Sequence, residues 1–124
     1  MSKKTFVYTG CDNLEAMAEA KNYNNYLIEL VEKATNQVNS KKPKILDFGA
    51  GSGTYADMLM KKGIKVDCLE PDLVLQKILK SKKYEVVADI KYLKPNTYDV
   101  IYSLNVFEHI KDDEPVVELL KTAL

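Results

Sequence analysis

The sequence contains no arginine and no tryptophan, a single histidine and only two cysteines among its 124 residues. All 18 basic residues are therefore lysines, so no guanidinium group is available to hold a carboxylate or a phosphate with two parallel hydrogen bonds. Cys11 and Cys68 are too few for a disulfide scaffold in a chain of this size, and no C-x-x-C pair suggests a metal site. We expect a reduced, cytoplasmic protein without a bound metal.

The chain also lacks a net charge and a long apolar run. Its 18 lysines are balanced by 18 acidic residues, whereas a nucleic-acid-binding protein usually carries a basic excess. The first residues have no apolar core of the kind found in signal peptides, and no segment approaches the roughly 18 apolar residues of a membrane span. These absences argue against nucleic acid as a partner and against a membrane span.

What is present is the composition of an ordinary globular domain. Hydrophobic residues make up 46% and charged residues 29%, and 124 residues suffice for one domain with its own core but not for two. Ahead of Pro43 the pattern predicts two helices. The first opens with a capping box at residues 12–15 and ends near Ala20, and the second has an apolar face that recurs at three- and four-residue steps from Tyr26 to Ala34.

After Pro43, short apolar segments alternate with helical ones. We expect strands at residues 44–48, 64–69, 84–88 and 98–104, and helices at 54–62, 70–80 and from 112 onward. Such alternation forms βαβ units, in which the strands are parallel and the crossovers are right-handed. The predicted fold class is α/β, with an N-terminal helical cap at residues 1–43 and a sheet-containing half-domain at residues 44–124 that together make one compact unit.

A glycine-rich loop, residues 49–53, joins the first predicted strand to the following helix. Glycines permit a tight turn and let a ligand approach the backbone, while the helix N-terminus offers free amides. Glu70 follows the next strand, where a carboxylate can accept hydrogen bonds from ribose hydroxyls. The combination indicates a nucleotide cofactor. The alternatives are an ordinary strand–helix turn for the glycines and an exposed helix-entry residue for Glu70.

Two further acids bear on which cofactor this is. Gly51 to Ala56 fits the G-x-G-x-x-A variant of the dinucleotide fingerprint, but Asp47 lies inside the first strand, where such a site normally has an apolar residue. A buried carboxylate needs a partner, and a cationic group of a ligand would supply one. Asp89 closes the third strand and can accept a hydrogen bond from an adenine amine. The alternatives are a turn or cap acid at Asp47 and an Asx turn at Asp89.

Residues 45–53, 68–72, 87–90 and 98–110 resemble, in order and spacing, four motifs of the class I S-adenosylmethionine-dependent methyltransferases. The resemblance implies a Rossmann-like parallel sheet of seven strands in the order 3-2-1-4-5-7-6, of which this chain contains the part with the order 3-2-1-4. It also implies S-adenosylmethionine as cofactor and S-adenosylhomocysteine as product. The resemblance places Asp47 at the amino group, Gly49, Gly51 and Gly53 at the methionine part, Glu70 at the ribose, Asp89 and Ile90 at the adenine, and Ser103, Leu104 and Asn105 near the sulfonium, with Phe48, Ala50 and Pro71 beside them.

Three more residues are candidates by the same resemblance. Tyr23 lies in a segment similar to the family's preceding helix, whose aromatic residue closes over the cofactor; a core or surface aromatic is the alternative. Glu108 and His109 are the candidate catalytic residues, because a histidine titrates near neutral pH. Some family members use such a pair for metal or substrate. With an asparagine at 105 and no second histidine we expect no closed metal site, and structural support near the substrate mouth is the alternative.

The leading hypothesis is methyl transfer to a small-molecule acceptor, for which similar bacterial enzymes suggest a sugar or lipid precursor. The alternatives are a cofactor-binding fragment without turnover and an NAD-type dinucleotide-binding domain. With four strands, the apolar run at residues 100–104 becomes a sheet edge, and exposed edges pair with other strands. We therefore expect a homodimer or domain swap through this strand, or a fold held by the N-terminal helices, and a chain too short to be a complete enzyme.

Overall fold

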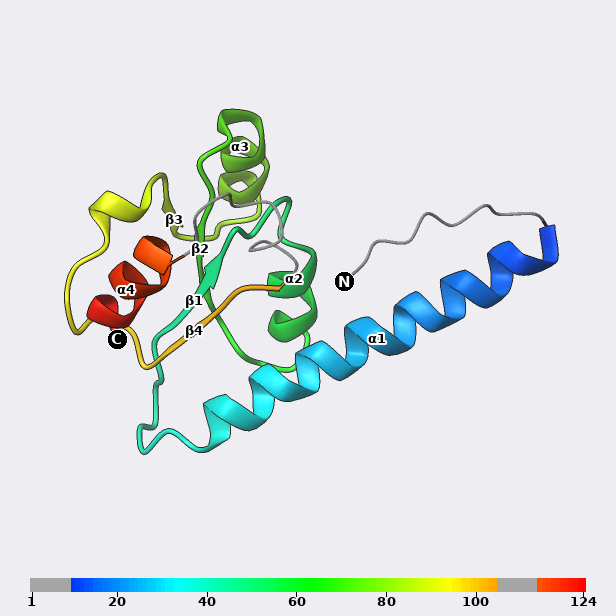
Figure 1. Cartoon of the computed structure of the whole chain (residues 1–124), viewed down its shortest axis with the longest axis horizontal. Coiled ribbons are helices and arrows are strands. Elements are labelled where there is room, and N and C mark those ends of the chain that lie inside the picture. The colour runs from blue at the N-terminus through cyan, green and yellow to red at the C-terminus, as the bar shows by residue number, and fades with distance from the viewer. Residues whose placement is uncertain (1–9, 105–113) are drawn as a thin grey trace.

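The computed structural model describes residues 10–104 and 114–124. Its four strands are parallel and lie in the order β3-β2-β1-β4, which confirms the predicted order 3-2-1-4 (Figure 1). Asn105, Glu108 and His109 lie outside the described residues. The elements in chain order are α1 (Gly10–Asn36), β1 (Ile45–Phe48), α2 (Thr54–Met60), β2 (Asp67–Leu69), α3 (Leu73–Ser81), β3 (Val86–Val87), the short 3-10 helix η1 (Ile90–Tyr92), β4 (Val100–Tyr102) and α4 (Glu114–Ala123).

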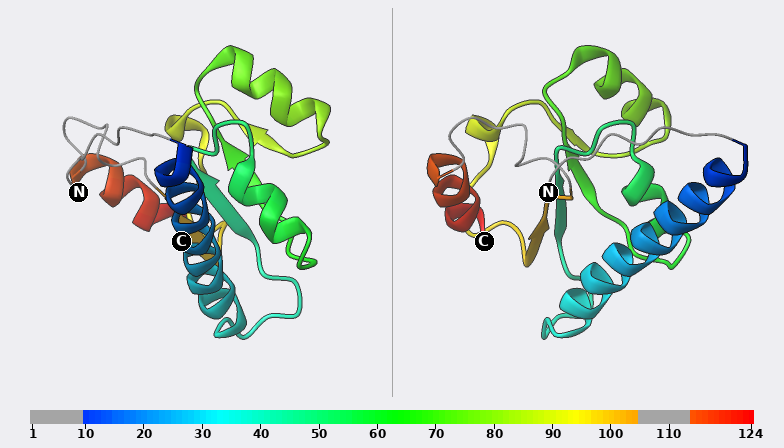
Figure 2. Two further views of the ribbon diagram at one scale, coloured as in Figure 1. Left: turned by 90° about the vertical axis from the view of Figure 1, so that its right-hand side faces the viewer. Right: turned by 45° about the vertical axis from the view of Figure 1, so that its right-hand side comes forward.

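The prediction of two helices ahead of the sheet is wrong, because α1 runs without interruption from Gly10 to Asn36. The polar run at residues 21–25, between the two predicted helices, contains no proline or glycine, so nothing there stops backbone hydrogen bonding. At 1.5 Å per residue the helix is about 40 Å long. Its C-terminal half lies beside the sheet and its N-terminal half projects beyond the α/β body (Figures 1 and 2). Within the described ranges, no helix has the length and apolarity needed to span a membrane.

Two apolar clusters, one on each face of the sheet, hold the fold together. The cluster on the first face combines side chains from α1, α2 and α3 with strand residues and includes Ile28, Val31, Leu59, Leu79, Cys68 and Tyr102. On the opposite face α4 packs against the strands, and that cluster includes Leu46, Phe48, Leu69, Leu120 and Ala123. Figure 2 shows α4 on the other side of the sheet from α2 and α3.

The second strand begins later than predicted, because a helix-ending turn comes first. At the end of α2, Ile64 donates its backbone N–H to Leu59, and Gly63 donates to Met60. With Gly63 at φ +80°, this is a Schellman motif. The turn uses Ile64, so β2 begins only at Asp67.

The third strand is shortened in the same way, by a turn without glycine. At the end of α3, Tyr84 donates its backbone N–H to Leu79 and Lys83 donates to Lys80. The left-handed position is occupied by Lys83, at φ +74°. Because Tyr84 belongs to this turn, β3 begins only at Val86.

Candidate functional site

The glycine-rich loop stands at the carboxyl edge of the sheet and is fixed to the neighbouring strand. Gly49 and Ala50 both donate their backbone N–H groups to the carbonyl of Leu69, at 2.9 and 3.1 Å. Gly49, Gly51 and Gly53 all have positive φ, at +77°, +63° and +94°. Ligands of open α/β sheets bind at this edge. Apart from Tyr23 on α1, the predicted site residues that the structure describes lie at or just after the carboxyl ends of β1, β2, β3 and β4.

Two of the glycines have different surroundings. A Cβ atom built on Gly53 would lie 3.0 Å from Cδ2 of Leu79 and 3.5 Å from the ring of Tyr84, so this glycine is required by packing against α3. A Cβ atom built on Gly51 would meet no described residue within 4 Å. Among the described residues, the space over Gly51 is therefore open, as a loop that receives a ligand requires.

Glu70 links the glycine-rich loop to the start of α3. Its side chain is 8% exposed. Oε1 accepts a hydrogen bond from the Gly51 amide at 2.8 Å, and Oε2 accepts one from the Asp72 amide at 3.1 Å. Gln76 of α3 donates its side-chain amide to the Glu70 carbonyl at 2.8 Å, while Pro71 is exposed. A carboxylate oxygen can accept two hydrogen bonds, and each oxygen of Glu70 accepts one from these amides, so Glu70 retains acceptor capacity for ribose hydroxyls.

Asp47 is the only polar residue of β1, and its side chain is 2% exposed. Its register partners are Cys68 on β2 and Tyr102 on β4, and Cys68 pairs in turn with Val86 on β3. Register partners on parallel strands point to the same face, so Val86, Cys68, Asp47 and Tyr102 form one cross-sheet row. Within that row the Tyr102 hydroxyl donates to Oδ2 of Asp47 at 2.9 Å.

The electrostatic surroundings of Asp47 favour a cationic group of a ligand. Burial raises its pKa, the hydrogen bond from Tyr102 lowers it, and the nearby charge of Glu70 raises it, with the result at about 7. None of the ion pairs formed among the described residues includes Asp47 or Glu70. Two acids thus lie beside the loop, and no described lysine forms an ion pair with either of them. Sequence reasoning found both acids but missed Tyr102, whose role depends on the pairing register.

Asp89 and Ile90, which were expected at the adenine, lie just past the carboxyl end of β3. This strand reaches the same edge because Glu70 donates its backbone N–H to the carbonyl of Val87 at 3.0 Å. Asp89 caps η1, with Oδ1 accepting a hydrogen bond from the Lys91 amide at 3.0 Å. This is the Asx turn that the sequence left as an alternative, and it engages one of the two oxygens. Ile90 packs against the cluster on the α4 face.

The residues expected near the sulfonium and the loop fall into two groups. Ser103, just past β4, has a buried Oγ without a hydrogen-bond partner among the described residues, so it is a polar atom still to be satisfied. Leu104 and Ala50 pack into the cluster on the α1 face, and Phe48 packs into the cluster on the α4 face. The side chains of these three residues therefore belong to the core.

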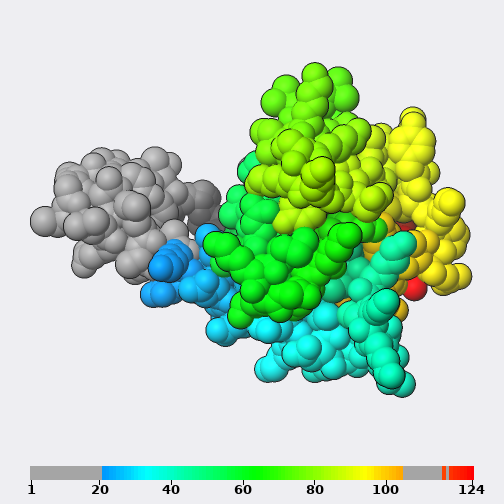
Figure 3. Space-filling view, turned by 180° about the vertical axis from the view of Figure 1, so that it is seen from behind, coloured from blue at the N-terminus to red at the C-terminus, as the bar shows by residue number. Residues whose placement is uncertain are grey.

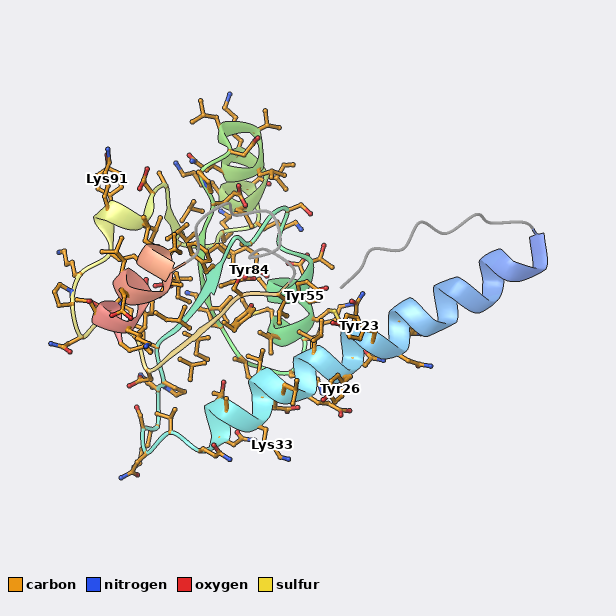
Figure 4. All side chains as sticks on the ribbon, in the orientation of Figure 1. Tyr23, Tyr26, Lys33, Tyr55, Tyr84 and Lys91 are labelled. Atoms are coloured by element: carbon orange, nitrogen blue, oxygen red, sulfur yellow. The ribbon has the colours of Figure 1, made fainter. Side chains whose placement is uncertain are left out.

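Tyr23 is 52% exposed on α1, next to Tyr26, which is also exposed. Figure 4 shows both tyrosines on the middle of α1, with Tyr55 on the neighbouring α2. The link between these two helices runs from the hydroxyl of Tyr55 to Oδ1 of Asn24, at 3.0 Å. Tyr23 is thus an exposed aromatic on α1, and its closure over a cofactor stays a prediction.

A polar network supports the loop from the α3 side and was not foreseen. Lys82 donates to the Ser52 carbonyl at 2.9 Å and to Asp57 at 2.8 Å, and the hydroxyl of Tyr84 donates to Asp57 at 2.6 Å. Burial raises the pKa of Asp57, but these hydrogen bonds and the charges of Lys82 and Lys61 outweigh it and hold that pKa below its usual value. The network joins the loop, the first turn of α2 and the end of α3.

The remaining reactive groups form no second site among the residues that the structure describes. Cys68 is fully buried, and burial together with the charge of Asp47 raises its pKa to about 12. No group of three potential metal ligands occurs within the described ranges.

A separate cavity of about 660 Å³ lies at the opposite, amino-terminal edge of the sheet. It is lined by the end of α1 and by the segments before β1 and β2, which Figure 3 shows side by side in cyan and green. Its lysines, Lys41, Lys42, Lys44 and Lys65, are accompanied by Asp67 and Glu85. Because ligands of open α/β sheets bind at the carboxyl ends of the strands, we place the candidate site at the glycine-rich loop rather than here.

Comparison with known proteins gives a consistent family. A profile of the family described as a methyltransferase domain matches residues 12–124. An uncharacterized methyltransferase of Bacillus cytotoxicus is 34% identical over 82 residues, which cover 62% of this chain and 39% of that protein. The chain therefore spans about two fifths of the length of this curated relative.

Solved structures show the same fold. A SAM-dependent methyltransferase from Archaeoglobus fulgidus superposes with a TM-score of 0.61 at 16% identity, covering 82% of this chain and 48% of that one. A TehB-like SAM-dependent methyltransferase from Corynebacterium glutamicum gives a TM-score of 0.58 at 24% identity, covering 86% of this chain and 67% of that one.

Proposed function

Because the chain belongs to the class I S-adenosylmethionine-dependent methyltransferases, we propose that it binds S-adenosylmethionine at the glycine-rich loop and serves methyl transfer to a small-molecule acceptor. The observation that carries the proposal is Asp47. It is a buried carboxylate beside an open loop, and no lysine among the described residues pairs with it. An ammonium group of a ligand would remove the cost of that burial.

The described residues fit the cofactor at three points. No described residue lies close over Gly51, so a ligand can approach the backbone of the loop. Glu70 retains acceptor capacity for ribose hydroxyls, and the Oγ of Ser103 has no partner among the described residues. In this proposal Asp47 holds the ammonium group, Glu70 the ribose, and Asp89 the adenine. Within the described part of the chain, one oxygen of Asp89 accepts no hydrogen bond.

The chain contributes binding and orientation rather than covalent chemistry. S-adenosylmethionine, when bound, supplies a methyl group already activated by a positively charged sulfur. Holding donor and acceptor in line is worth roughly 7–11 kcal/mol in favourable cases. A general base is needed only for an acceptor that carries a proton, and His109 with Glu108 is then the candidate.

For the acceptor we keep a sugar or lipid precursor, on the resemblance of residues 23–26 to the head of bacterial methyltransferases with such substrates. A screen of acceptors with the longest natural version of the chain tests this choice. A chain that binds the cofactor and methylates none of these acceptors would leave the binding-only alternative standing.

The architecture of the unit is part of the proposal. Residues 1–43 would act as a helical cap on the half-domain at 44–124, which is supported by Ile28 and Val31 of α1 in one cluster with α2. The apolar β4, at one edge of the described sheet, would pair with a second copy. The free thiol of Cys68 suits the reducing cytoplasm.

Calorimetry with S-adenosylhomocysteine and with NAD tests the cofactor. We expect binding of S-adenosylhomocysteine and no heat with NAD, and the reverse result would overturn the proposal. Asp47→Ala and Glu70→Ala should each weaken binding at least about tenfold while circular dichroism shows the fold retained. Glu85→Ala, which removes an exposed carboxylate at the other edge, is the matched control and should bind like the wild type.

A further inference from the structure

Tyr102 and Asp47 meet because of the sheet register. They are Cα partners on the adjacent parallel strands β4 and β1, so their side chains leave the sheet on the same face. The hydroxyl of Tyr102 donates to Oδ2 of Asp47 at 2.9 Å, and Tyr102 is 8% exposed. This bond is therefore a fixed feature of the sheet rather than a surface contact.

The hydrogen bond uses one oxygen of Asp47 and leaves the other. Among the described residues, Oδ1 of Asp47 has no hydrogen-bond partner, although a carboxylate accepts bonds on both oxygens. The donor itself is secure, since burial, the charge of Asp47 and the hydrogen bond all raise the pKa of Tyr102 and keep its proton in place. Asp47 is thus held in one orientation with one oxygen unused.

Among the described residues around Asp47, Tyr102 is the one that stabilises the charged form of its carboxylate. From β2 and the residue after it come the thiol of Cys68 and the carboxylate of Glu70, and from the turn before β3 comes the phenol of Tyr84. The side chains packed into this layer from α1 and α2, such as Ile28 and Leu59, are apolar. No cation among the described residues forms an ion pair with Asp47.

We propose that Tyr102 is the positioning residue for the cofactor's amino-acid end: it holds Oδ2 of Asp47 so that Oδ1 is presented to the ammonium group. This rests on the proposed function, because it assumes that Asp47 receives that ammonium group. Tyr102 itself does not touch the reacting atoms. Tyr102 lies within the motif at residues 98–110, but the motif does not predict this role, because the role depends on the register of β4 against β1.

Tyr102 also governs the charge of Asp47. Burial raises the pKa of Asp47 and the bond from Tyr102 lowers it, leaving the value at about 7. Without the donor the pKa rises further, so at neutral pH more of the carboxyl is protonated and unable to pair with a cation. Loss of the hydroxyl should therefore weaken ligand binding most at the acid end of the pH range.

The test compares two ligands and two tyrosines by calorimetry between pH 5.5 and 7.5. S-adenosylhomocysteine carries the ammonium group, whereas 5′-methylthioadenosine has the same adenosine and thioether without the amino acid. Tyr98→Phe is the matched control, since Tyr98 is equally buried and donates to Asp67 at 2.9 Å, away from the loop. It should bind both ligands like the wild type.

For Tyr102→Phe we expect roughly fivefold weaker binding of S-adenosylhomocysteine at pH 7 and close to tenfold weaker binding at about pH 5.5, the losses produced by an Asp47 pKa about one unit above its value of about 7. The acid limb of its pH profile should move to higher pH by the same amount, while binding of 5′-methylthioadenosine changes less than about twofold. Equal losses for the two ligands, or an unchanged S-adenosylhomocysteine profile, would overturn the role of Tyr102. If the wild type binds neither ligand, the proposed function itself fails, and this inference with it.

A second measurement does not depend on how well the variant folds. In the wild-type chain labelled with ¹³C-tyrosine, the Cζ resonance of Tyr102 should shift when S-adenosylhomocysteine binds and stay in place with 5′-methylthioadenosine. A resonance that responds alike to both ligands would contradict the proposal as well.

Discussion

Asp47 carries a cost that its neighbours in β1 do not. Ile45, Leu46 and Phe48 are buried apolar side chains. A carboxylate among them is desolvated, and the described residues compensate it with a single hydrogen bond. A residue of this kind lowers the stability of the ligand-free fold. Its retention is understandable if the ligand supplies the missing charge.

Asp47→Asn should make the ligand-free chain more stable at pH 8 and remove a pH dependence. The carboxyl titrates at 3.8 in the unfolded chain and at about 7 in the folded one. The folded state holds the proton more tightly, so the stabilisation is complete below pH 4 and is lost as the pH rises to 7. At 1.36 kcal/mol per unit the loss reaches roughly 4 kcal/mol.

Urea unfolding from pH 4 to 8 measures this effect. The wild type should lose stability over the range and Asp47→Asn should not, while its affinity for S-adenosylhomocysteine falls. Parallel curves for the two proteins would mean that Asp47 is not buried as described.

At this scale the sequence predicted the acids but not their partners. That Asp47 needs a counterpart followed from a charge inside an apolar strand. The sequence did not predict that Tyr102 is the hydrogen-bond partner of Asp47, because strand register is set by packing across the sheet. The two bonds of Glu70 to the Gly51 and Asp72 amides also depend on the folded loop.

Gly53 and Gly51 are glycines for different reasons, packing against α3 and approach of a ligand, and a pair of alanine substitutions separates these two reasons. Gly53→Ala should destabilise the fold, because its φ of +94° is strained for alanine and its Cβ would press on Leu79 at 3.0 Å. The Cβ of Gly51→Ala would meet no described residue within 4 Å, and its φ is +63°, so this change should cost about 1–2 kcal/mol and act mainly on ligand binding.

Thermal unfolding and calorimetry with S-adenosylhomocysteine check the pair. We expect the larger drop in melting temperature for Gly53→Ala and a larger loss of affinity per unit of lost stability for Gly51→Ala. The opposite ranking in both measurements would exclude ligand approach over Gly51.

The turn after α3 offers a stabilising change. Lys83 occupies the left-handed position of the Schellman motif at φ +74°, which glycine adopts without strain. Lys83→Gly should raise the free energy of unfolding by about 0.5–1 kcal/mol. Lys80→Gly, inside the helix, is the matched control and should lower it by about 1 kcal/mol. Equal effects of the two changes in urea unfolding would contradict the assigned turn.

Element types were well predicted, and element ends were not. Alternating apolar segments sufficed for four parallel strands, yet Ile64 and Tyr84 were assigned to strands because their side chains are apolar, whereas both serve helix-ending turns. The turn at Lys83 gave no sequence signal, since it lacks the usual glycine. The polar run in α1 suggested a break that helix propensity does not require.

At the scale of the whole molecule, the association of the chain depends on β4, which forms one edge of the described sheet. Its residues Val100 and Ile101 are only partly buried. An apolar edge strand pairs readily with another strand. We therefore predict that the 124-residue chain associates through β4.

Light scattering across a range of concentrations measures the mass of the particle. We expect a dimer whose β4 amides exchange more slowly with solvent than they do on dilution. A monomer at millimolar concentration would contradict both the dimer and the domain swap, and would leave the packing of α1 on the sheet as the feature that holds the fold.

The burial of Cys68 has a practical consequence. It lies in the middle of the cross-sheet row with 0% exposure and a pKa of about 12, so an alkylating reagent reaches its thiolate only when β2 opens. The rate at which Cys68 is alkylated, measured by mass spectrometry on its own peptide, then reports how often the sheet opens, in a chain that has no tryptophan fluorescence to do so. A ligand that binds only the folded chain lowers this alkylation rate in proportion to its occupancy.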